Sequence, residues 1–184
     1  NKPREENALS VEDITSTTVD GKKAFKNINF LIKQGEIVGI AGVEGNGQRE
    51  LAESILGVFP IEKGKITLND QEINLLNTRE RREFGISFIP EDRQSQGLLM
   101  DVSLSENMIL GRQSTSAYKS KYSNIIYSQA NQDSQLVIEN YDVRTPGNKT
   151  LALALSGGNQ QKFVVGRELE DNPKLLIASQ PTRG

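Results

Sequence analysis

The sequence contains no cysteine, no histidine and no tryptophan. This stretch therefore cannot form disulfides or thiolate and imidazole metal sites, and it cannot use histidine as an acid or base. Aromatic residues make up 5% of the chain and the formal net charge is −2, so the composition lacks the basic surface that nucleic-acid binding usually needs. Any catalysis must rest on carboxylates, on backbone groups that bind phosphate, or on a metal held by oxygen.

Long apolar runs are absent as well. No stretch approaches the length of a membrane span, and no signal peptide is visible, so we expect a soluble cytosolic domain. The 184 residues suffice for one domain with a sizeable core. Residues 1–7 are polar and linker-like, and the chain stops soon after an apolar run at 175–178. We expect residues 8–184 to be a partial domain of a longer polypeptide.

The most informative stretch is a serine and two glycines that open a helical pattern. Its residues are Leu155, Ser156, Gly157, Gly158, Asn159, Gln160 and Gln161. Backbone N–H groups at such a helix start point outward, the helix dipole adds partial positive charge, and no side chain blocks an approaching phosphate. This pattern predicts an anion-binding tip. The alternative is an ordinary serine N-cap before an amphipathic helix.

A second glycine-rich stretch lies between an apolar strand pattern at 36–41 and a helical pattern that ends near Gly57. It fits the glycine spacing of a phosphate-binding loop, G-x-x-x-x-G-K-[ST]. Two of its side chains do not fit, because Gln48 stands in place of the lysine and Arg49 in place of the hydroxyl that binds Mg²⁺. The candidate nucleotide-binding residues, here named the phosphate loop, are Gly42, Val43, Glu44, Gly45, Asn46, Gly47, Gln48, Arg49 and Glu50.

The pattern of elements predicts an α/β fold of the P-loop NTPase type. Strand patterns at 9–14 and 24–32, joined by a turn at Asp20-Gly21, predict an N-terminal antiparallel β lobe that 65–69 completes. Strands at 36–41, 85–89 and 174–178 are expected to share a mostly parallel core sheet. Residues 79–83 mix charges of both signs and predict a solvated helical face. A capping box at Ser103 and Glu106 and a helix at 124–140 predict an inserted helical lobe at about 97–145.

Together these motifs resemble the ATP-binding cassette (ABC) proteins, and the resemblance covers residues 8–184. The sequence is similar to the second, C-terminal cassette of tandem ATPase subunits from bacterial sugar and nucleoside importers. In this family the stretch at 155–161 is the signature motif, which contacts the γ-phosphate of ATP held by a partner cassette. Further matching segments are 35–42, 90–93, 97–99, 105–107 and 180–184.

The resemblance also implies that the chain's own ATP site has lost its chemistry. Ser179 takes the place of the aspartate that organises Mg²⁺, and Gln180 that of the glutamate that activates water, so no catalytic residue is intact and no metal ligand set is expected. Glu91 occupies the position of a coupling loop, where the family usually has a glutamine. Residues 17–20 supply no aromatic ring for adenine. We expect this chain by itself not to hydrolyse ATP.

The same resemblance implies partners and location. The expected partners are a first ABC cassette of the same polypeptide or subunit, transmembrane permease subunits and, indirectly, an extracellular solute-binding protein; nucleic acid is not expected. ATP and Mg²⁺ would bind at the composite site, with weak or absent binding in this chain alone. The expected location is peripheral, on the cytoplasmic face of the cell membrane. The resemblance implies that Ser156, Gly157 and Gly158 of the signature motif serve the competent site. The impaired site is lined by Gln48, Arg49, Ser179 and Gln180.

Two other functions remain open at this stage. One is a soluble ABC-type ATPase of DNA repair or translation, against which the acidic balance and the 90–93 segment argue. The other is a dinucleotide-binding oxidoreductase with Asp70 on the ribose. The glycines at 42, 45 and 47 are spaced wrongly for its fingerprint, and it leaves the 155–161 stretch unexplained.

Overall fold

The computed structural model describes residues 4–18, 21–43 and 45–181. The chain divides into two compact units, Asn1–Ile86 and Ser87–Gly184, each with its own elements and core. The predicted turn residue Asp20, the loop residue Glu44 and the linker residues 1–3 lie outside the described part of the chain.

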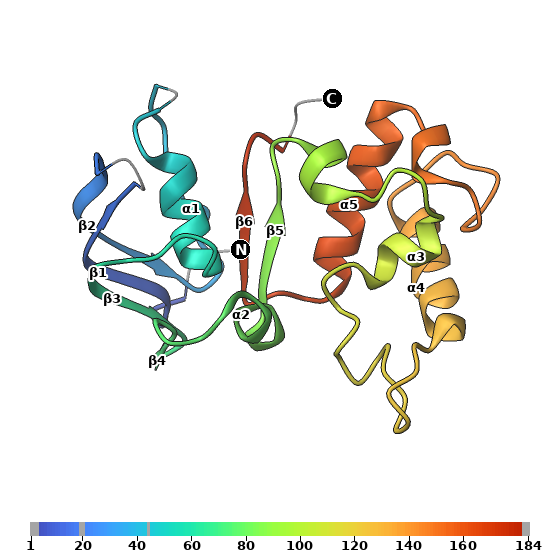
Figure 1. Ribbon diagram of the computed structural model, residues 1–184, viewed down its shortest axis with the longest axis horizontal. Helices are drawn as coiled ribbons and strands as arrows, with labels where there is room; N and C mark the ends of the chain where they lie inside the picture. Colours follow the sequence, from blue (N-terminus) through green and yellow to red (C-terminus); the bar gives the residue numbers. More distant parts are fainter. Residues whose placement is uncertain (1–3, 19–20, 44, 182–184) are drawn as a thin grey trace. The chain divides into compact units, whose positions relative to one another are not determined.

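The first unit is built on an antiparallel sheet with strand order β2-β1-β3-β4 (Figure 1). β1 (Asn7–Thr17) pairs with β2 (Lys23–Lys33) on one edge and with β3 (Lys63–Leu68) on the other. β4 (Gln71–Glu72) returns through Asn69 and Asp70, whose φ values of 44° and 63° are typical of a two-residue hairpin turn. The antiparallel lobe is therefore confirmed. Its most deeply buried apolar side chains are Leu9, Val11, Ile14, Ile66, Leu68 and Ile73.

Two helices complete this unit, α1 (Gln48–Leu56) and α2 (Thr78–Phe84). The expected solvated face at 79–83 holds for Arg79, Glu80 and Glu83, which are exposed, but not for Arg81, which is 3% exposed. Its guanidinium donates to the carbonyl oxygens of Ser54 and Ile55 at 2.6 and 2.9 Å. These carbonyls lie in the last turn of α1, where the regular helix bonds end, and that of Ser54 also accepts from the N–H of Gly57, at 3.2 Å. A buried arginine therefore satisfies acceptors that the helix end leaves open. Burial lowers the pKa of Arg81.

The predicted strand at 36–41 is also wrong. These residues form no strand, and their apolar side chains are exposed, Ile37 at 98% and Ile40 at 55%. A strand exists through hydrogen bonds to a neighbouring strand, and among the described residues none pairs with this segment. The apolar pattern fits a buried strand, but a pattern in one segment cannot supply the neighbouring strand that it needs.

The second unit combines helices with a two-stranded sheet. β5 (Ile86–Ile89) lies beside β6 (Leu175–Ala178), and both run in the same direction in Figure 1. The predicted parallel sheet is therefore narrower than expected, because 36–41 does not join it. The chain segment that connects β5 to β6 forms the helical elements of this unit. These are the π-helical turn η1 (Arg93–Gly97), α3 (Leu104–Ile109), α4 (Tyr127–Asn140), the 3₁₀ turn η2 (Ala152–Ala154) and α5 (Gly157–Glu170).

One apolar cluster holds the helices of this unit together. It contains residues from β5, α3, α4 and α5, with Leu104, Val137, Phe163 and Val164 fully buried. The predicted capping box at the start of α3 is present, because the Ser103 hydroxyl accepts from the Glu106 N–H and the Glu106 carboxylate accepts from the Ser103 N–H. The apolar contacts fix α5, and so they fix the stretch at 155–161 that begins it.

Candidate functional site

The phosphate loop lies in the first unit, at the start of α1. Gly47 is the N-cap residue of α1, with φ 90°, and a Cβ on it would lie 2.2 Å from the carbonyl oxygen of Ala24. Only glycine fits at this position, because the left-handed backbone and the close approach of β2 both exclude a side chain. Gly45 also has a positive φ, 87°. The glycines of the predicted loop therefore do adopt a tight turn before a helix.

The side chains of Gln48 and Arg49 in this loop contact nearby residues of the first unit. Gln48 donates weakly from Nε2 to the carbonyl of Val43 at 3.4 Å, and this amide nitrogen lies 1.7 Å from where a Cβ would stand on Gly42. Arg49 is exposed and pairs with Glu53, Nε to Oε1 2.7 Å. Gln48 carries no charge and the guanidinium of Arg49 cannot ligate a cation, so these two positions supply neither the ammonium nor the hydroxyl of a Mg²⁺–nucleotide loop. The residues present do not fit a Mg²⁺ ion there.

The stretch at 155–161 lies in the second unit and opens α5 as predicted. Ser156 is the N-cap residue by position, with φ −62° and ψ 155°, yet its side chain makes no capping hydrogen bond. Its Oγ instead accepts from Nδ2 of Asn159 at 2.9 Å, so the hydroxyl keeps its proton as a donor. Asn159 is held in turn by the N–H of Arg144, which donates to its Oδ1 at 2.9 Å.

This geometry bears on the alternative of an ordinary N-cap. In the same chain Ser103 and Asn77 cap α3 and α2 with complete capping boxes. Ser156 does not, and it leaves the first N–H groups of α5 without a side-chain acceptor from the cap. Ser156 and Gly158 are exposed, and a Cβ on Gly158 would meet nothing within 4 Å. The helix start is therefore open to an outside acceptor.

The other residues of this stretch anchor it to the unit. Leu155 is buried in the apolar cluster and Gln160 is 2% exposed. Gln161 donates from Nε2 to the carbonyl of Pro181 at 2.8 Å, which brings the start of α5 beside the segment after β6.

Ser179 and Gln180 follow β6, and Glu91 is the second residue after β5. Because the two strands run in the same direction (Figure 1), these residues leave the small sheet at the same end. The N–H of Ser179 donates to the carbonyl of Ile89 at 2.9 Å, so the pairing of β5 with β6 continues to Ser179. Glu91 follows Ile89 by two residues and is exposed. Gln180 is exposed and has a φ of 47°. The described residues contain no cluster of three carboxylates that could hold a metal ion.

One residue near the site was not predicted. Arg93 belongs to the 90–93 segment, which the sequence marked only as a whole. Its Nη2 lies 2.4 Å from where a Cβ would stand on Gly157, so its guanidinium occupies the space that a side chain would need at that residue. The signal in the sequence was the glycine at 157, which indicated close contact but not the contacting group.

A second unpredicted feature is a set of buried charges behind α5. Arg112 and Arg167 are 2% and 3% exposed, and Glu168 is fully buried. Arg112 donates to Oδ2 of Asp171 at 2.5 Å and to the carbonyl of Arg167 at 2.6 Å, and Arg167 pairs with Glu168 at 3.0 Å. These bonds join the segment after α3 to the C-terminal end of α5. They therefore anchor α5 at the end opposite to Ser156.

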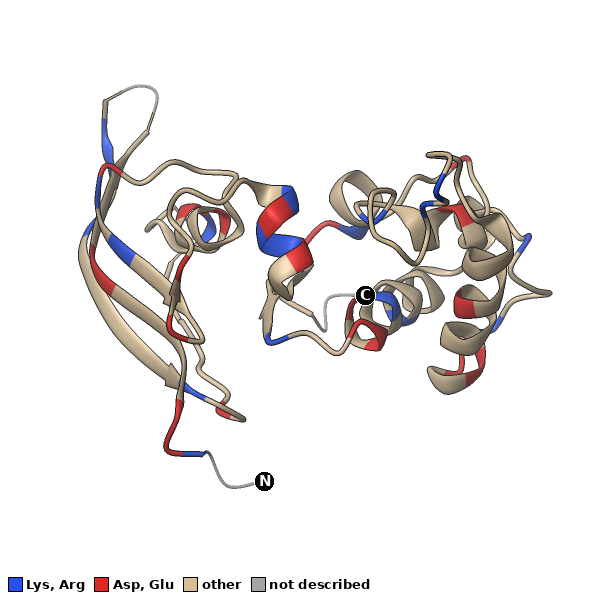
Figure 2. Ribbon diagram, turned by 90° about the horizontal axis from the view of Figure 1, so that it is seen from below, with Lys and Arg blue, Asp and Glu red and all other residues tan. Residues whose placement is uncertain are grey.

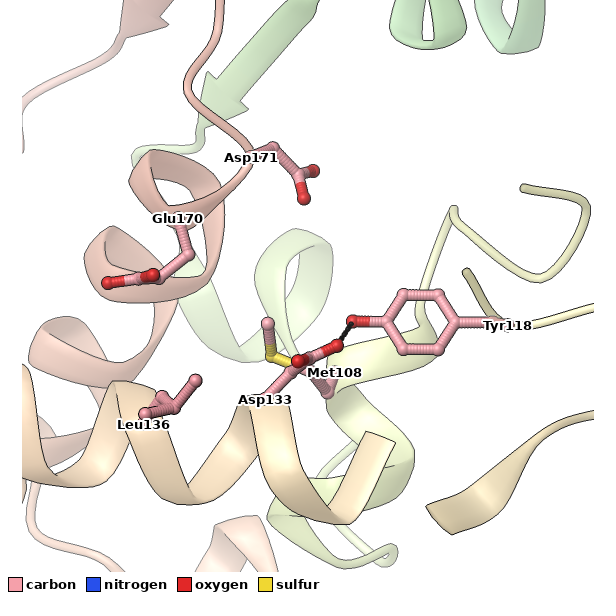
Figure 3. Close-up of a pocket in the computed structure, with 6 residues that line it drawn as sticks. All are labelled: Met108, Tyr118, Asp133, Leu136, Glu170 and Asp171. Carbon is pink, nitrogen blue, oxygen red and sulfur yellow. Dashed lines mark hydrogen bonds between the residues drawn. The ribbon is translucent and has the colours of Figure 1, made fainter. Parts of the chain in front are cut away.

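A small pocket lies beside these buried charges (Figure 3). Its volume is about 130 Å³, and it is lined by Met108, Tyr118, Asp133, Leu136, Glu170 and Asp171. The Tyr118 hydroxyl donates to Oδ2 of Asp133 at 2.7 Å, and burial raises the pKa of this phenol. The sequence predicted no site here, and none of the residues at 42–50 or 155–161 lines the pocket.

Comparison with known proteins identifies relatives over nearly the whole chain. The family model described as ABC transporter matches residues 25–183. The guanosine import ATP-binding protein NupO of Bacillus subtilis (strain 168) is 45% identical over 183 residues, covering 96% of this chain and 34% of that protein. The nucleoside import ATP-binding protein NupA of Lactococcus lactis is 38% identical over 96% of this chain and 35% of that protein. The ribose import ATP-binding protein RbsA of Clostridium tetani is 35% identical over 89% and 32%.

Solved structures agree on the fold. A nucleotide-free ATP-binding cassette from an ABC transporter superposes with a TM-score of 0.79 at 22% identity, over 97% of this chain and 70% of that one. A bacterial Atm1-family ABC exporter with ATP bound gives 0.73 at 20% identity, over 97% and 30%. The chain spans about a third of the length of the curated relatives it matches. No helix among the residues described is long and apolar enough to cross a membrane.

The antiparallel lobe, the glycine turn before α1 and the open helix start at Ser156 all occur within the matched residues, and the family match covers most of the chain. The chain belongs to the ABC transporter family, as an ATP-binding cassette related to nucleoside and sugar import proteins.

Proposed function

We propose that the chain is a nucleotide-binding domain of a bacterial importer for nucleosides or simple sugars, and that it works by completing the ATP site of a partner cassette. Its signature residues 155–161 contact the phosphate held by the partner, whereas its own phosphate loop forms an impaired second site. ATP with Mg²⁺ at the partner cassette's site would supply the hydrolysable phosphate, and Ser156, Gly157 and Gly158 of this chain bind and orient it.

The observation that carries this proposal is the open start of α5. Ser156 occupies the N-cap without capping, so the first N–H groups of the helix keep their capacity to bind an anion. The partial positive charge of the helix start favours a phosphate, and the bare Gly158 allows its oxygen atoms to approach the backbone. The Ser156 hydroxyl, oriented by Asn159, adds a further donor.

The proposal of an impaired second site rests on four side chains. Gln48 and Arg49 replace the ammonium and hydroxyl of a working loop, and the Gln48 amide folds against its own loop. Ser179 and Gln180 stand at the end of an apolar strand, where they provide neither an anionic ligand nor a general base. Glu91 is the residue we assign to the coupling loop.

The partners follow from the same proposal. They are a first cassette of the same polypeptide or subunit, the permease subunits and, through them, a solute-binding protein, with the cassettes on the cytoplasmic face of the membrane. The names of NupO and NupA favour nucleosides as the solute class, and that of RbsA extends it to sugars.

The two alternatives receive less support. For a DNA-repair or translation ATPase one would expect a basic face, whereas acidic and basic residues are intermixed along both units in Figure 2. For a dinucleotide-binding oxidoreductase Asp70 would bind a ribose, but this residue forms the hairpin turn between β3 and β4.

The test compares variants of the complete transporter. Ser156→Arg places bulk and charge at the open helix start, and we expect it to abolish transport and most ATPase activity. Gln48→Ala removes an uncharged side chain from an impaired site and is expected to cost far less. Ser116→Arg, at an exposed serine of the same unit, is the matched control. Comparable damage from Gln48→Ala and Ser156→Arg would mean that this chain's own loop is used in catalysis.

A further inference from the structure

A buried amide connects the signature to the segment that leaves β5. Gln160 is 2% exposed and has four hydrogen-bond partners. Its Nε2 donates to the carbonyls of Ala152 and Leu155 at 3.1 and 3.2 Å, and its Oε1 accepts from Nε of Arg93 and Nε2 of Gln94 at 3.4 and 3.2 Å. The amide nitrogen therefore bonds the residues before α5, and the amide oxygen bonds the side chains of η1.

The same segment also contacts the tip of α5 directly. The Arg93 guanidinium fills the space beside Gly157, whereas nothing lies near Gly158. Gly97, at the other end of η1, lies against Val164 one helical turn further along α5, with 3.5 Å between a Cβ on Gly97 and Cγ2 of Val164. η1 thus contacts α5 at three residues of the helix, which are Gly157, Gln160 and Val164.

η1 has a fixed shape of its own. The Asp92 carboxylate accepts from the N–H groups of Gln94 and Ser95 at 3.0 and 3.3 Å and so caps the turn. The hydrogen bonds from Ser95 and from Gln94 lower the pKa of Asp92. Arg93 and Gln94 are therefore held on a short rigid turn that follows Pro90, and they do not reach Gln160 from a loose loop.

We propose that Arg93 and Gln94 are positioning residues, which set the place and order of the signature tip through Gln160. This inference rests on the proposed function, because the signature matters only where a phosphate binds it. A displacement of residues 90–97 must either break the bonds to Gln160 or carry the start of α5 with it, since a buried amide cannot easily lose its partners. The position of the segment after β5 is thereby transmitted to the residues that contact phosphate.

The first measurement is hydrogen exchange of the amides at 156–161 in the complete protein, without nucleotide. Arg93→Lys keeps the charge but loses the planar guanidinium, and Gln94→Ala removes an exposed side chain, so both variants are expected to fold. The first N–H of this stretch that the helix itself bonds is that of Gln160, which donates to the carbonyl of Ser156 at 2.9 Å. We expect exchange at Gln160 and Gln161 to become about tenfold faster in each variant, the size that fits the loss of one such hydrogen bond. Arg79→Ala, at an exposed arginine of α2, is the control and should leave these amides unchanged.

Gln160→Met tests the route. Arg93 also touches Gly157 directly, whereas Gln94 bonds the Gln160 amide, so Gln94→Ala is the variant to combine. If Gln94 acts through Gln160, adding Gln94→Ala to Gln160→Met should increase exchange no further. Unchanged exchange in Arg93→Lys and Gln94→Ala, or fully additive effects with Gln160→Met, would overturn the inference.

ATPase assays of the assembled transporter separate this inference from the proposed function. We expect Arg93→Lys to lower kcat/KM for ATP in parallel with the exchange at 156–161. Faster exchange with unchanged ATPase activity would support the positioning role and refute the proposed role of the signature in ATP binding. Normal exchange with reduced activity would refute the positioning role, because Arg93 would then act by its charge or shape alone.

Discussion

The two adjacent glycines of the signature have different surroundings, and this difference predicts different effects of one substitution. Gly158→Ala meets open space and replaces glycine in a helix, so we expect the free energy of unfolding to rise by up to about 1 kcal/mol. Gly157→Ala places a methyl group against Arg93 and should lose that gain. Denaturant unfolding of both variants checks this. Equal stabilisation would show that Arg93 moves aside without cost.

Arg112 offers a second prediction at the scale of single residues. It is 2% exposed, pairs with Asp171 and Glu168, and donates to the backbone carbonyls of Met108 and Arg167. Arg112→Ala leaves Glu168 buried with fewer partners, so we expect a loss of about 3–5 kcal/mol in unfolding free energy. The exposed Arg79→Ala should change stability by less than about 1 kcal/mol. A small effect of Arg112→Ala in urea titrations would contradict the structural role given to these charges.

The burial and the partners of these arginines could not be predicted from the sequence. Arg81 and Arg112 look like ordinary surface charges in the sequence, and only the folded chain brings carbonyl groups around them. The same holds for Arg93 at Gly157. Local patterns identify glycine turns and helix starts because those depend on neighbours in the sequence. They do not identify a partner that lies 60 or more positions away, as Gln160 does from Arg93.

At the scale of elements, the capping box of α3 gives a prediction about pH. Hydrogen bonds from the Ser103 hydroxyl and N–H lower the pKa of Glu106 below its ordinary value near 4.5. The ionised form therefore stabilises the fold above that value, and this contribution is lost as the pH falls through the lowered pKa. Protection of the α3 amides from hydrogen exchange should weaken in this acid range. Glu106→Gln, which keeps an acceptor but does not titrate, should remove that part of the pH dependence.

Ser103→Ala provides the matching measurement at neutral pH. Loss of the N-cap is expected to cost about 1 kcal/mol, seen as faster exchange of the first α3 amides. Ser156→Ala, at an N-cap that makes no capping bond, should leave the amides of α5 almost unchanged. An equal effect of the two substitutions would mean that Ser156 does cap its helix, and the main support for the proposed phosphate contact would be lost.

Most elements could be predicted because their signals are local. The hairpin of β1 and β2, the helix after Gly47, the capping box of α3 and the helix after Ser156 all follow from periodicity and end signals. The segment at 36–41 fails for the opposite reason. Its apolar residues fit a buried strand, but strand formation depends on a partner that the pattern does not contain. For the site, the glycine turns were predictable and the contacts around them were not.

At the scale of the whole molecule, the chain by itself is expected not to hydrolyse ATP. In the proposed function, Gln180 replaces the water-activating carboxylate, Gln48 replaces the ammonium, and the signature acts only on the loop of a partner cassette. Loss of a general base alone reduces rates on the order of 10²–10⁴-fold. The measurement is phosphate release by the purified chain, with Ser156→Arg as the control for contaminating activity. Turnover that the chain shows and Ser156→Arg does not would contradict this expectation.

We also expect that restoring the lysine at position 48 does not make the chain's own ATP site active. Gln48→Lys returns the ammonium to the phosphate loop, yet Arg49 still cannot ligate Mg²⁺, and Ser179 and Gln180 still provide no carboxylate. In a complete transporter whose competent site is silenced by Ser156→Arg, we expect Gln48→Lys to add no ATPase activity. Gln48→Lys combined with the Ser116→Arg control should retain the activity of the unaltered protein, which shows that the loop tolerates lysine. Recovery of hydrolysis by the lysine alone would mean that residues other than Ser179 and Gln180 supply the metal ligand and the base, and the proposal of one competent and one impaired site would have to be given up.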